Sequence, residues 1–156
     1  MWPDLRENEQ LLINGETGEV LLRDTLGVHQ TATPVAADIN NNGYDDVVLS
    51  MNVGREQFDG SFIYEHLLVA FDLYNNHQLA LDSLQPGANL ASTPWVGDLD
   101  GNGNLDIIYS VLGDQRDIFA MNGFKMYRLR SNFDSDKEVR WGSYMGSEYN
   151  GIYRRQ

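Results

Sequence analysis

A stretch of the chain at residues 33–50 is repeated at residues 93–110, with a constant offset of 60 positions. Both copies begin with Thr-Pro, continue into a loop rich in aspartate, asparagine and glycine, and end in an apolar run followed by serine. A repeat of this period is typical of chains built from repeated β units, each of which buries its apolar face against a neighbour. The repeat therefore predicts two copies of one supersecondary unit within 156 residues.

Short apolar segments rich in β-branched and aromatic residues lie on both sides of each loop. Residues 35–37 and 95–97 precede the loops, and residues 47–49 and 107–109 follow them. Residues of these types fit the pleated, half-buried surface of a sheet. Each loop is therefore expected to join two neighbouring antiparallel strands.

Three further segments carry the signature of a β-hairpin. In residues 11–22 two apolar runs flank an Asn-Gly and a Thr-Gly pair, and glycine supplies the positive φ that tight hairpin turns need. Residues 66–72 with 78–81, and residues 118–121 with 125–129, likewise surround a polar turn. Each repeat thus offers about four short strands, and the first hairpin resembles the last half of a unit whose front half is missing.

Both loops place oxygen-bearing side chains at alternate positions, which is the pattern that a hard cation such as Ca²⁺ requires. In the first loop the expected ligands at positions one, three, five, seven and nine are Asp38, Asn40, Asn42, the Tyr44 carbonyl and Asp46. In the second loop they are Asp98, Asp100, Asn102, the Asn104 carbonyl and Asp106. Ligand charge helps to set calcium affinity, and the second set holds three carboxylates against two in the first. We therefore expect up to two Ca²⁺ ions, with the second loop binding more tightly.

Two other interpretations of the loops compete with calcium binding between strands. An EF-hand needs a glutamate at loop position twelve and a helix on each side, but Leu49 and Tyr109 stand at that position and the flanks are β-branched. The other alternative is a turn without metal, because Asn, Asp and Gly favour turns by themselves. The presence of two aligned copies favours metal binding. For the asparagine-rich first copy, weak binding and an empty loop both remain open.

Composition limits the classes of partner and the location. A formal net charge of −12 argues against nucleic acid, because the phosphate backbone would repel the chain. There is no run of about 18 apolar residues, so no membrane span is expected. The chain has no cysteine, and its opening residues lack the pattern of a signal peptide. Either the protein stays inside the cell or its signal was removed upstream, and we expect the second, an exported protein that is extracellular or at the cell surface.

The C-terminal part of the chain combines basic and aromatic side chains. Of the 11 basic residues, those after Phe124 outnumber the acids there, which gives this part about +3 and the remainder about −15. The asymmetry would favour head-to-tail association of copies, and scattered surface charge is the alternative. Trp141, Tyr144 and Tyr153 either stack on a sugar or pack against the last sheet, in one or two edge strands.

Catalysis has little support in the sequence. His29, His66 and His77 lie far apart without the spacing of a triad or a metal site, and each is expected at the surface or in a loop. Close carboxylates occur chiefly in the two loops, where metal ligation explains them. The glycine-rich part of the second loop is not a phosphate loop, because no lysine follows it and no helix is indicated.

With both copies considered, the chain resembles the FG-GAP and VCBS-type β-propeller repeats, which are related to the calcium-bearing blades of integrin α-subunits. The resemblance rests on residues 33–50 and 93–110, whose loops fit the pattern Asp-x-Asp/Asn-x-Asp/Asn-Gly-x-x-Asp. Residues 13–20 also resemble the outer strands of quinoprotein-like blades, but no cofactor-binding residues of that family can be placed. The resemblance implies an all-β fold of four-stranded antiparallel propeller blades, two full blades plus a half.

The implied organisation has four segments: a half-blade and linker at 1–30, blade repeats at 31–90 and 91–130, and an aromatic, basic closing segment at 131–156. Propellers normally close with four to eight blades. The resemblance therefore implies either the remaining blades of a larger chain, or a homo-oligomer or filament assembled by strand complementation.

The implied function is a non-enzymatic calcium-binding module in structure, adhesion or self-assembly, with a carbohydrate or protein ligand. The alternative is the C-terminal fragment of a carbohydrate-active propeller enzyme of the polysaccharide lyase type.

Overall fold

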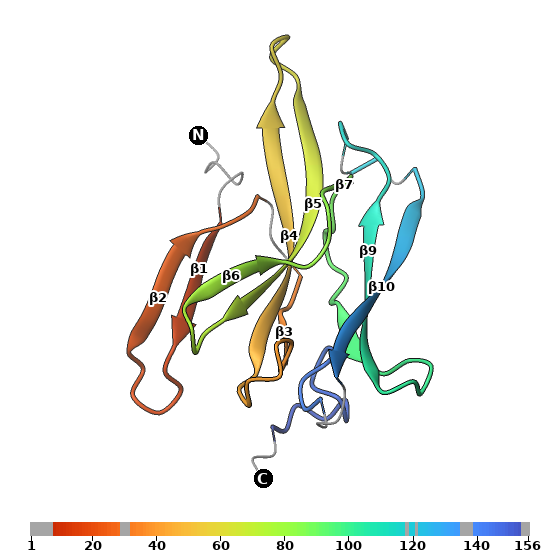
Figure 1. Ribbon diagram of the computed structural model, residues 1–156. Helices are drawn as coiled ribbons and strands as arrows, with labels where there is room; N and C mark the ends of the chain where they lie inside the picture. The colour runs from red at the N-terminus through yellow and green to blue at the C-terminus, as the bar shows by residue number, and fades with distance from the viewer. Residues whose placement is uncertain (1–7, 29–31, 118, 121, 135–138, 154–156) are drawn as a thin grey trace.

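A computed structural model describes residues 8–28, 32–117, 119–120, 122–134 and 139–153. These residues form three antiparallel sheets, which do not close into a barrel (Figure 1). No helix capable of crossing a membrane occurs among them. The prediction of an all-β fold is confirmed.

The N-terminal hairpin predicted from residues 11–22 is present and makes a sheet of its own, the hairpin sheet. It consists of β1 (Glu9–Ile13) and β2 (Val20–Thr25), paired antiparallel. The Asn14 side chain organises the turn, because its Oδ1 accepts hydrogen bonds from the backbone N–H groups of Glu16 and Thr17. Gly18 follows with φ 74°, the left-handed conformation that glycine adopts without strain.

The first repeat forms the first sheet, whose strands follow one another in chain order. They are β3 (Val35–Ala37), β4 (Asp46–Glu56), β5 (Phe62–Asp72) and β6 (His77–Ala80). The two-residue strand β7 (Gln85–Pro86) pairs with β5 beside Glu65 and His66. The long β4–β5 hairpin extends beyond the rest of the sheet, as Figure 1 shows. The strands predicted on both sides of the first loop, and the hairpin of β5 with β6, are confirmed.

The second repeat forms the second sheet, which has three strands among the described residues rather than the expected four. They are β8 (Trp95–Gly97), β9 (Asn104–Leu112) and β10 (Phe124–Asp134). The hairpin predicted from 118–121 and 125–129 is wrong in its pairing, because β10 pairs directly with β9. Ile118 and Met121 lie outside the described residues, and Phe119 and Ala120 lie in a turn and a bend.

Two aspartates explain why the chain turns there instead of forming a strand. Asp114 Oδ1 accepts hydrogen bonds from the backbone N–H groups of Arg116 and Asp117. Asp117 Oδ1 accepts in turn from Phe119 and Ala120. Side-chain bonds of this kind give the backbone an alternative to a strand ladder.

The main hydrophobic core lies between the first and second sheets. It contains buried residues of the first sheet, such as Val48 and Leu68, and of the second, such as Ile107 and Tyr109. A smaller cluster around Leu49 and Val69 occupies the other face of the first sheet, on the side of the hairpin sheet. Because successive side chains of a strand point to opposite faces, the apolar run in β4 serves both clusters.

The C-terminal segment at 139–153 joins the two repeats and contains no strand, unlike the expected edge strands. The Trp141 carbonyl accepts a hydrogen bond from Ala36 N–H in β3 at 2.8 Å. The Gly142 carbonyl accepts one from Val96 N–H in β8 at 2.7 Å. The first strands of both sheets are therefore bound by adjacent residues of one segment, which otherwise consists of turns and bends.

A buried polar network lies between the first sheet and the connection to the second. Its members are Ser50, Asn52, His66 and Asn89. Ser50 Oγ and His66 Nε2 share a hydrogen bond of 2.7 Å, and Asn89 Nδ2 donates to Ser50 Oγ at 2.6 Å. His66 is fully buried and stacks on Tyr109, so the expectation of a surface or loop position was wrong for this histidine.

Candidate metal centre

Each repeat loop joins the short first strand of its sheet to the second strand. The strand register pairs Ala37 with Asp46 in the first sheet and Gly97 with Asp106 in the second. Asp38 and Asp98, at loop position one, come directly after Ala37 and Gly97. The register therefore brings each of them close to the aspartate at position nine of its own loop. The predicted placement of both loops between antiparallel strands is confirmed.

The aspartate at loop position one organises the backbone of each loop. Asp38 accepts hydrogen bonds from the N–H groups of Asn42 and Gly43, both at 2.9 Å. Asp98 likewise accepts from Gly101, Asn102 and Gly103, at 2.8 to 3.1 Å. These bonds are the same in kind, so the two loops have closely similar backbones.

Two residues in each loop adopt the left-handed conformation. Gly43 and Gly103 have φ of 95° and 85°. Two positions earlier Asn41 and Gly101 have φ of 56° and 70°. Asparagine is one of the few residues besides glycine that adopt this conformation readily. This explains why the first loop can have asparagine where the second loop has glycine.

The aspartate at position nine is buried in both copies. Asp46 and Asp106 are each 2% exposed. One carboxylate oxygen of each accepts from the backbone N–H of the second loop residue, Ile39 at 2.9 Å and Leu99 at 3.1 Å. The two loops differ in what else each carboxylate binds.

In the second loop three carboxylates converge on one another and on an arginine. Asp98, Asp100 and Asp106 each offer an oxygen, and these atoms lie within 4.8 Å of one another. From β10, Arg128 donates to both oxygens of Asp106 at 2.9 and 2.7 Å, and to Asp100 at 2.5 Å. These bonds lower the pKa of Asp106 below its usual range, and they raise the pKa of Arg128.

In the first loop the corresponding carboxylate has no such partner among the described residues. Asp46 Oδ1 is buried and has no hydrogen-bond partner in that part of the chain, and the same holds for Asn42 Nδ2. Asp72, at the end of β5, is joined to the loop because Asn40 Nδ2 donates to its Oδ2 at 2.7 Å. Burial raises the pKa of Asp46, and the nearby charges of Asp72 and Asp38 raise it further, against backbone hydrogen bonds that lower it.

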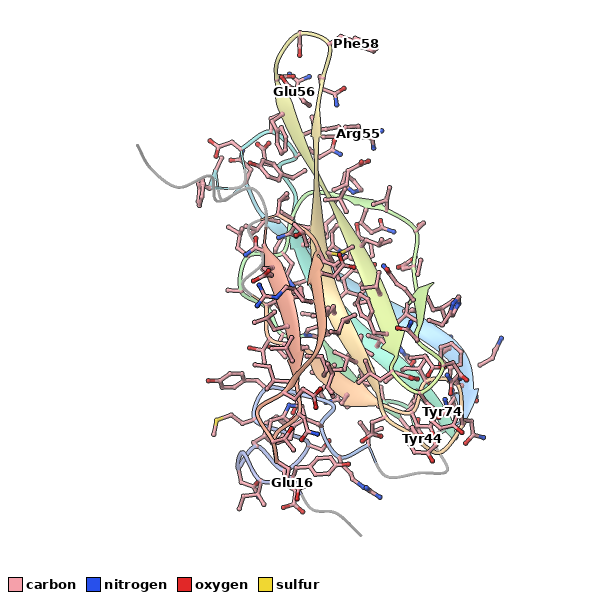
Figure 2. The ribbon with its side chains drawn as sticks, turned by 90° about the vertical axis from the view of Figure 1, so that its left-hand side faces the viewer. Glu16, Tyr44, Arg55, Glu56, Phe58 and Tyr74 are labelled. Carbon is pink, nitrogen blue, oxygen red and sulfur yellow. The ribbon has the colours of Figure 1, made fainter. Side chains whose placement is uncertain are left out.

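Among the remaining predicted ligand positions, the asparagine side chain at position five accepts a hydrogen bond within its own loop in both copies. Asn42 Oδ1 and Asn102 Oδ1 each accept a hydrogen bond from the N–H two residues on, at Tyr44 and Asn104. The Tyr44 ring stacks on Tyr74 with ring centroids 4.4 Å apart, which Figure 2 shows at one end of the molecule. All predicted ligand residues are thus in the loops.

Two charged residues next to the loops, Asp72 and Arg128, were missed from the sequence. Both lie on the third strand of their sheet, outside the repeated stretch. The signal that would have found them is strand register, which pairs Ala70 with Val48 and Arg128 with Ile108. That register was not predictable for β10, because its expected partner was another segment.

The donor sets fit a metal ion differently. The first loop offers oxygens of aspartate and asparagine and one buried carboxylate oxygen without a partner, which a hard cation such as Ca²⁺ would satisfy, although among the described residues only the second loop brings three carboxylates within 4.8 Å of one another. In the second loop the same carboxylate oxygen, and the neighbouring Asp100, already bind the Arg128 guanidinium. Ca²⁺ would have to displace this group before it could bind both carboxylates.

No protein-family model, no curated protein and no solved structure matches the chain. The geometry of the two loops and of the residues around them is therefore the basis for a functional conclusion.

Proposed function

We propose that this chain is a non-enzymatic calcium-binding module, in which Ca²⁺ at a loop between two strands stabilises a propeller-type blade. The observation that carries the proposal is the buried, unpartnered Asp46 Oδ1 in a loop whose other side chains present oxygen. A buried carboxylate oxygen without a partner is costly, because burial removes the water that would solvate its charge. A divalent cation would satisfy this atom and neutralise the carboxylates around it.

The arrangement of the sheets supports the propeller-type part of the proposal. The first and second sheets each begin with a three-residue strand, and the main strands that follow it pair in chain order. The two sheets pack face to face through the main core, and their first strands are in contact. This is the relation that neighbouring blades have around a propeller axis.

The proposed setting is an exported or surface protein in which further blades, in the same chain or in other copies, complete the structure. The hairpin sheet supports this, because it has two strands among the described residues and exposes large apolar side chains. These side chains are Leu11, Ile13, Val20 and Leu21. An isolated two-stranded sheet is marginally stable in water, so additional strands or sheets against it would be favourable.

Thermal unfolding with and without calcium tests the proposal. The melting temperature is expected to rise by about 5 °C or more in millimolar CaCl₂ and to return to its starting value after chelation, because an ion that binds only the folded state stabilises it. Asp46→Asn is expected to abolish the rise, and Asp59→Asn, in the exposed β4–β5 turn, serves as the control. An equal melting temperature in calcium and in chelator for the wild-type chain would contradict the proposal.

A further inference from the structure

The strand next to each loop carries different charges in the two repeats. Register pairs Ile108 with Arg128, and its counterpart Val48 with Ala70, so an arginine in the second sheet replaces an alanine in the first. Two residues further along, Arg130 pairs with Asp106. The equivalent residue in the first sheet is Asp72, one residue beyond the Val47–Phe71 pair.

This exchange reverses the charge beside the loops. The second sheet places two cations there, and the first sheet places a neutral residue and an anion. Counting these two positions alone, the second sheet is more positive by three charges, +2 against −1. The second loop itself has one carboxylate more than the first among its predicted ligands, so the neighbouring strand more than offsets the difference within the loops.

Arg128 stands where a cation is needed in the second loop. Its guanidinium binds both oxygens of Asp106 and one of Asp100, a paired geometry that suits the planar fork of arginine. The Asp106 side chain is only 3% exposed, so this ion pair is shielded from water on the carboxylate side. A positive group of the chain itself thus neutralises the carboxylates that would otherwise hold a metal ion.

Among the residues that the structure describes, the first loop has no such group. Within the described part of the chain, no lysine or arginine forms an ion pair with Asp46 or Asp72. Two buried side-chain atoms of the first loop have no hydrogen-bond partner among the described residues, and of these Asp46 Oδ1 is an acceptor that a cation would satisfy, whereas Asn42 Nδ2 is a donor. An unsatisfied carboxylate oxygen and the unbalanced charge therefore coincide at the first loop.

We propose that Ca²⁺ binds the first loop together with Asp72 of β5, and that Arg128 acts as a tethered cation which replaces the ion in the second loop. This inference rests on the proposed function and refines it, because it assigns one ion to the chain and names its loop. It also reverses the order of affinity expected from the number of carboxylates in each loop. Substitution of Arg128 by a neutral residue would open a second calcium site.

Calorimetric titration of calcium-free protein with CaCl₂ measures the number of ions. The wild-type chain is expected to bind one, Arg128→Gln two, and Arg128→Lys one, because lysine keeps the positive charge. Arg130→Gln is the matched control, since Arg130 is 72% exposed and lies 3.9 Å from Asp100, and one ion is expected. Asp72→Asn is expected to weaken binding to the wild-type site by about tenfold or more, because it removes a charged ligand.

Two backbone amides report on the loops separately. The N–H of Ile39 donates to Asp46 in the first loop, and the N–H of Leu99 donates to Asp106 in the second. In an NMR titration with CaCl₂, the Ile39 resonance of the wild-type chain is expected to shift while that of Leu99 stays. In Arg128→Gln both are expected to shift, and the same spectra show whether the variant is folded.

Different results would overturn the inference and the proposed function. A calcium-dependent shift of Leu99 without one of Ile39 in the wild-type chain, or a folded Arg128→Gln that binds only one ion, would overturn the inference and leave a calcium-binding module. Unchanged affinity in Asp72→Asn would remove Asp72 from the site. If neither the wild-type chain nor Arg128→Gln binds Ca²⁺, the proposed function fails together with the inference.

Discussion

The side-chain amide of Asn52 pairs with the backbone of Asn89, as donor in one hydrogen bond and as acceptor in another. Asn89 N–H donates to Asn52 Oδ1 at 2.7 Å, and Asn52 Nδ2 donates to the Asn89 carbonyl at 2.8 Å. Both residues are buried, and 37 positions of sequence separate them. The Asn52 amide thus takes the place of a strand neighbour for Asn89, and it fixes the connection between the two sheets to β4.

Replacement of Asn52 by alanine is expected to destabilise the chain by about 3 kcal/mol, because both backbone groups of Asn89 lose their partners in a buried place. Chemical denaturation measures this difference. Asn132→Ala, at an exposed position of β10, is the control and is expected to change stability by less than about 0.5 kcal/mol. Equal stability of the two variants would show that water replaces the Asn52 amide without loss.

Stability is expected to depend on pH through His66. Burial lowers the pKa of His66 from 6.5 to about 4, although the charge of Asp82 opposes this shift. Between these two values the unfolded chain binds more protons than the folded one, so stability falls as the pH falls from about 6.5 to about 4. The part due to His66 is about 3 kcal/mol and is fully present above pH 6.5.

Urea unfolding across this pH range checks the prediction. His66→Gln is expected to lose the slope that belongs to this histidine, whereas His77→Gln, at an exposed position of β6, is expected to keep it. Parallel curves for the wild-type chain and His66→Gln would assign the pH dependence to other groups.

Gly87 is required by a close approach between the two sheets. A Cβ at this position would lie 1.8 Å from the Leu112 carbonyl oxygen in β9, and its φ is 110°. Gly87→Ala is therefore expected to destabilise the chain by more than about 3 kcal/mol. Gly60 also has a positive φ but no atom within 4 Å of such a Cβ, so Gly60→Ala isolates the backbone strain and is expected to cost about 1 kcal/mol. A similar loss in both variants would mean that the Leu112 segment moves freely.

Terbium luminescence offers an optical test of which loop takes the ion. Tb³⁺ replaces Ca²⁺ at oxygen sites and emits when a nearby tyrosine transfers energy to it. Tyr44 belongs to the first loop and stacks on Tyr74. Tyr44→Phe is expected to reduce the emission strongly, with Tyr144→Phe, in the C-terminal segment, as the control. Equal emission from the two variants would place the ion away from the first loop.

The repeat was sufficient to predict the short first strand of each sheet, the loop after it and the strand that follows. Local sequence determines these features, because β-branched runs favour strands and the aspartate at position one closes the loop with its own backbone. The hairpin of β1 with β2 was predictable for the same reason. The prediction was weaker for the third strand of the second repeat, where Asp114 and Asp117 favour a turn that apolar residues alone do not reveal.

The surroundings of the loops were not predictable from the loops themselves. Asp72 and Arg128 approach from strands that lie 26 and 22 positions away from Asp46 and Asp106, and only their register brings them close. The count of carboxylates within a loop therefore included the charges of the loop itself but not those of the neighbouring strand. His66 was misplaced for a related reason, since a histidine within an apolar strand gives no sign of the Ser50 hydroxyl that accommodates it.

The hydrogen bonds of Trp141 and Gly142 also constrain the order in which the chain can fold. During synthesis both sheets emerge before residues 139–153, so Ala36 in β3 and Val96 in β8 must wait for their partners. For Ala36 that partner comes 105 residues later in the chain. Until then the first strands of both sheets keep an open hydrogen-bonding edge, which is the surface through which nascent chains associate wrongly. The open edges would then be covered when residues 139–153 pack against both sheets, and not when either repeat is complete.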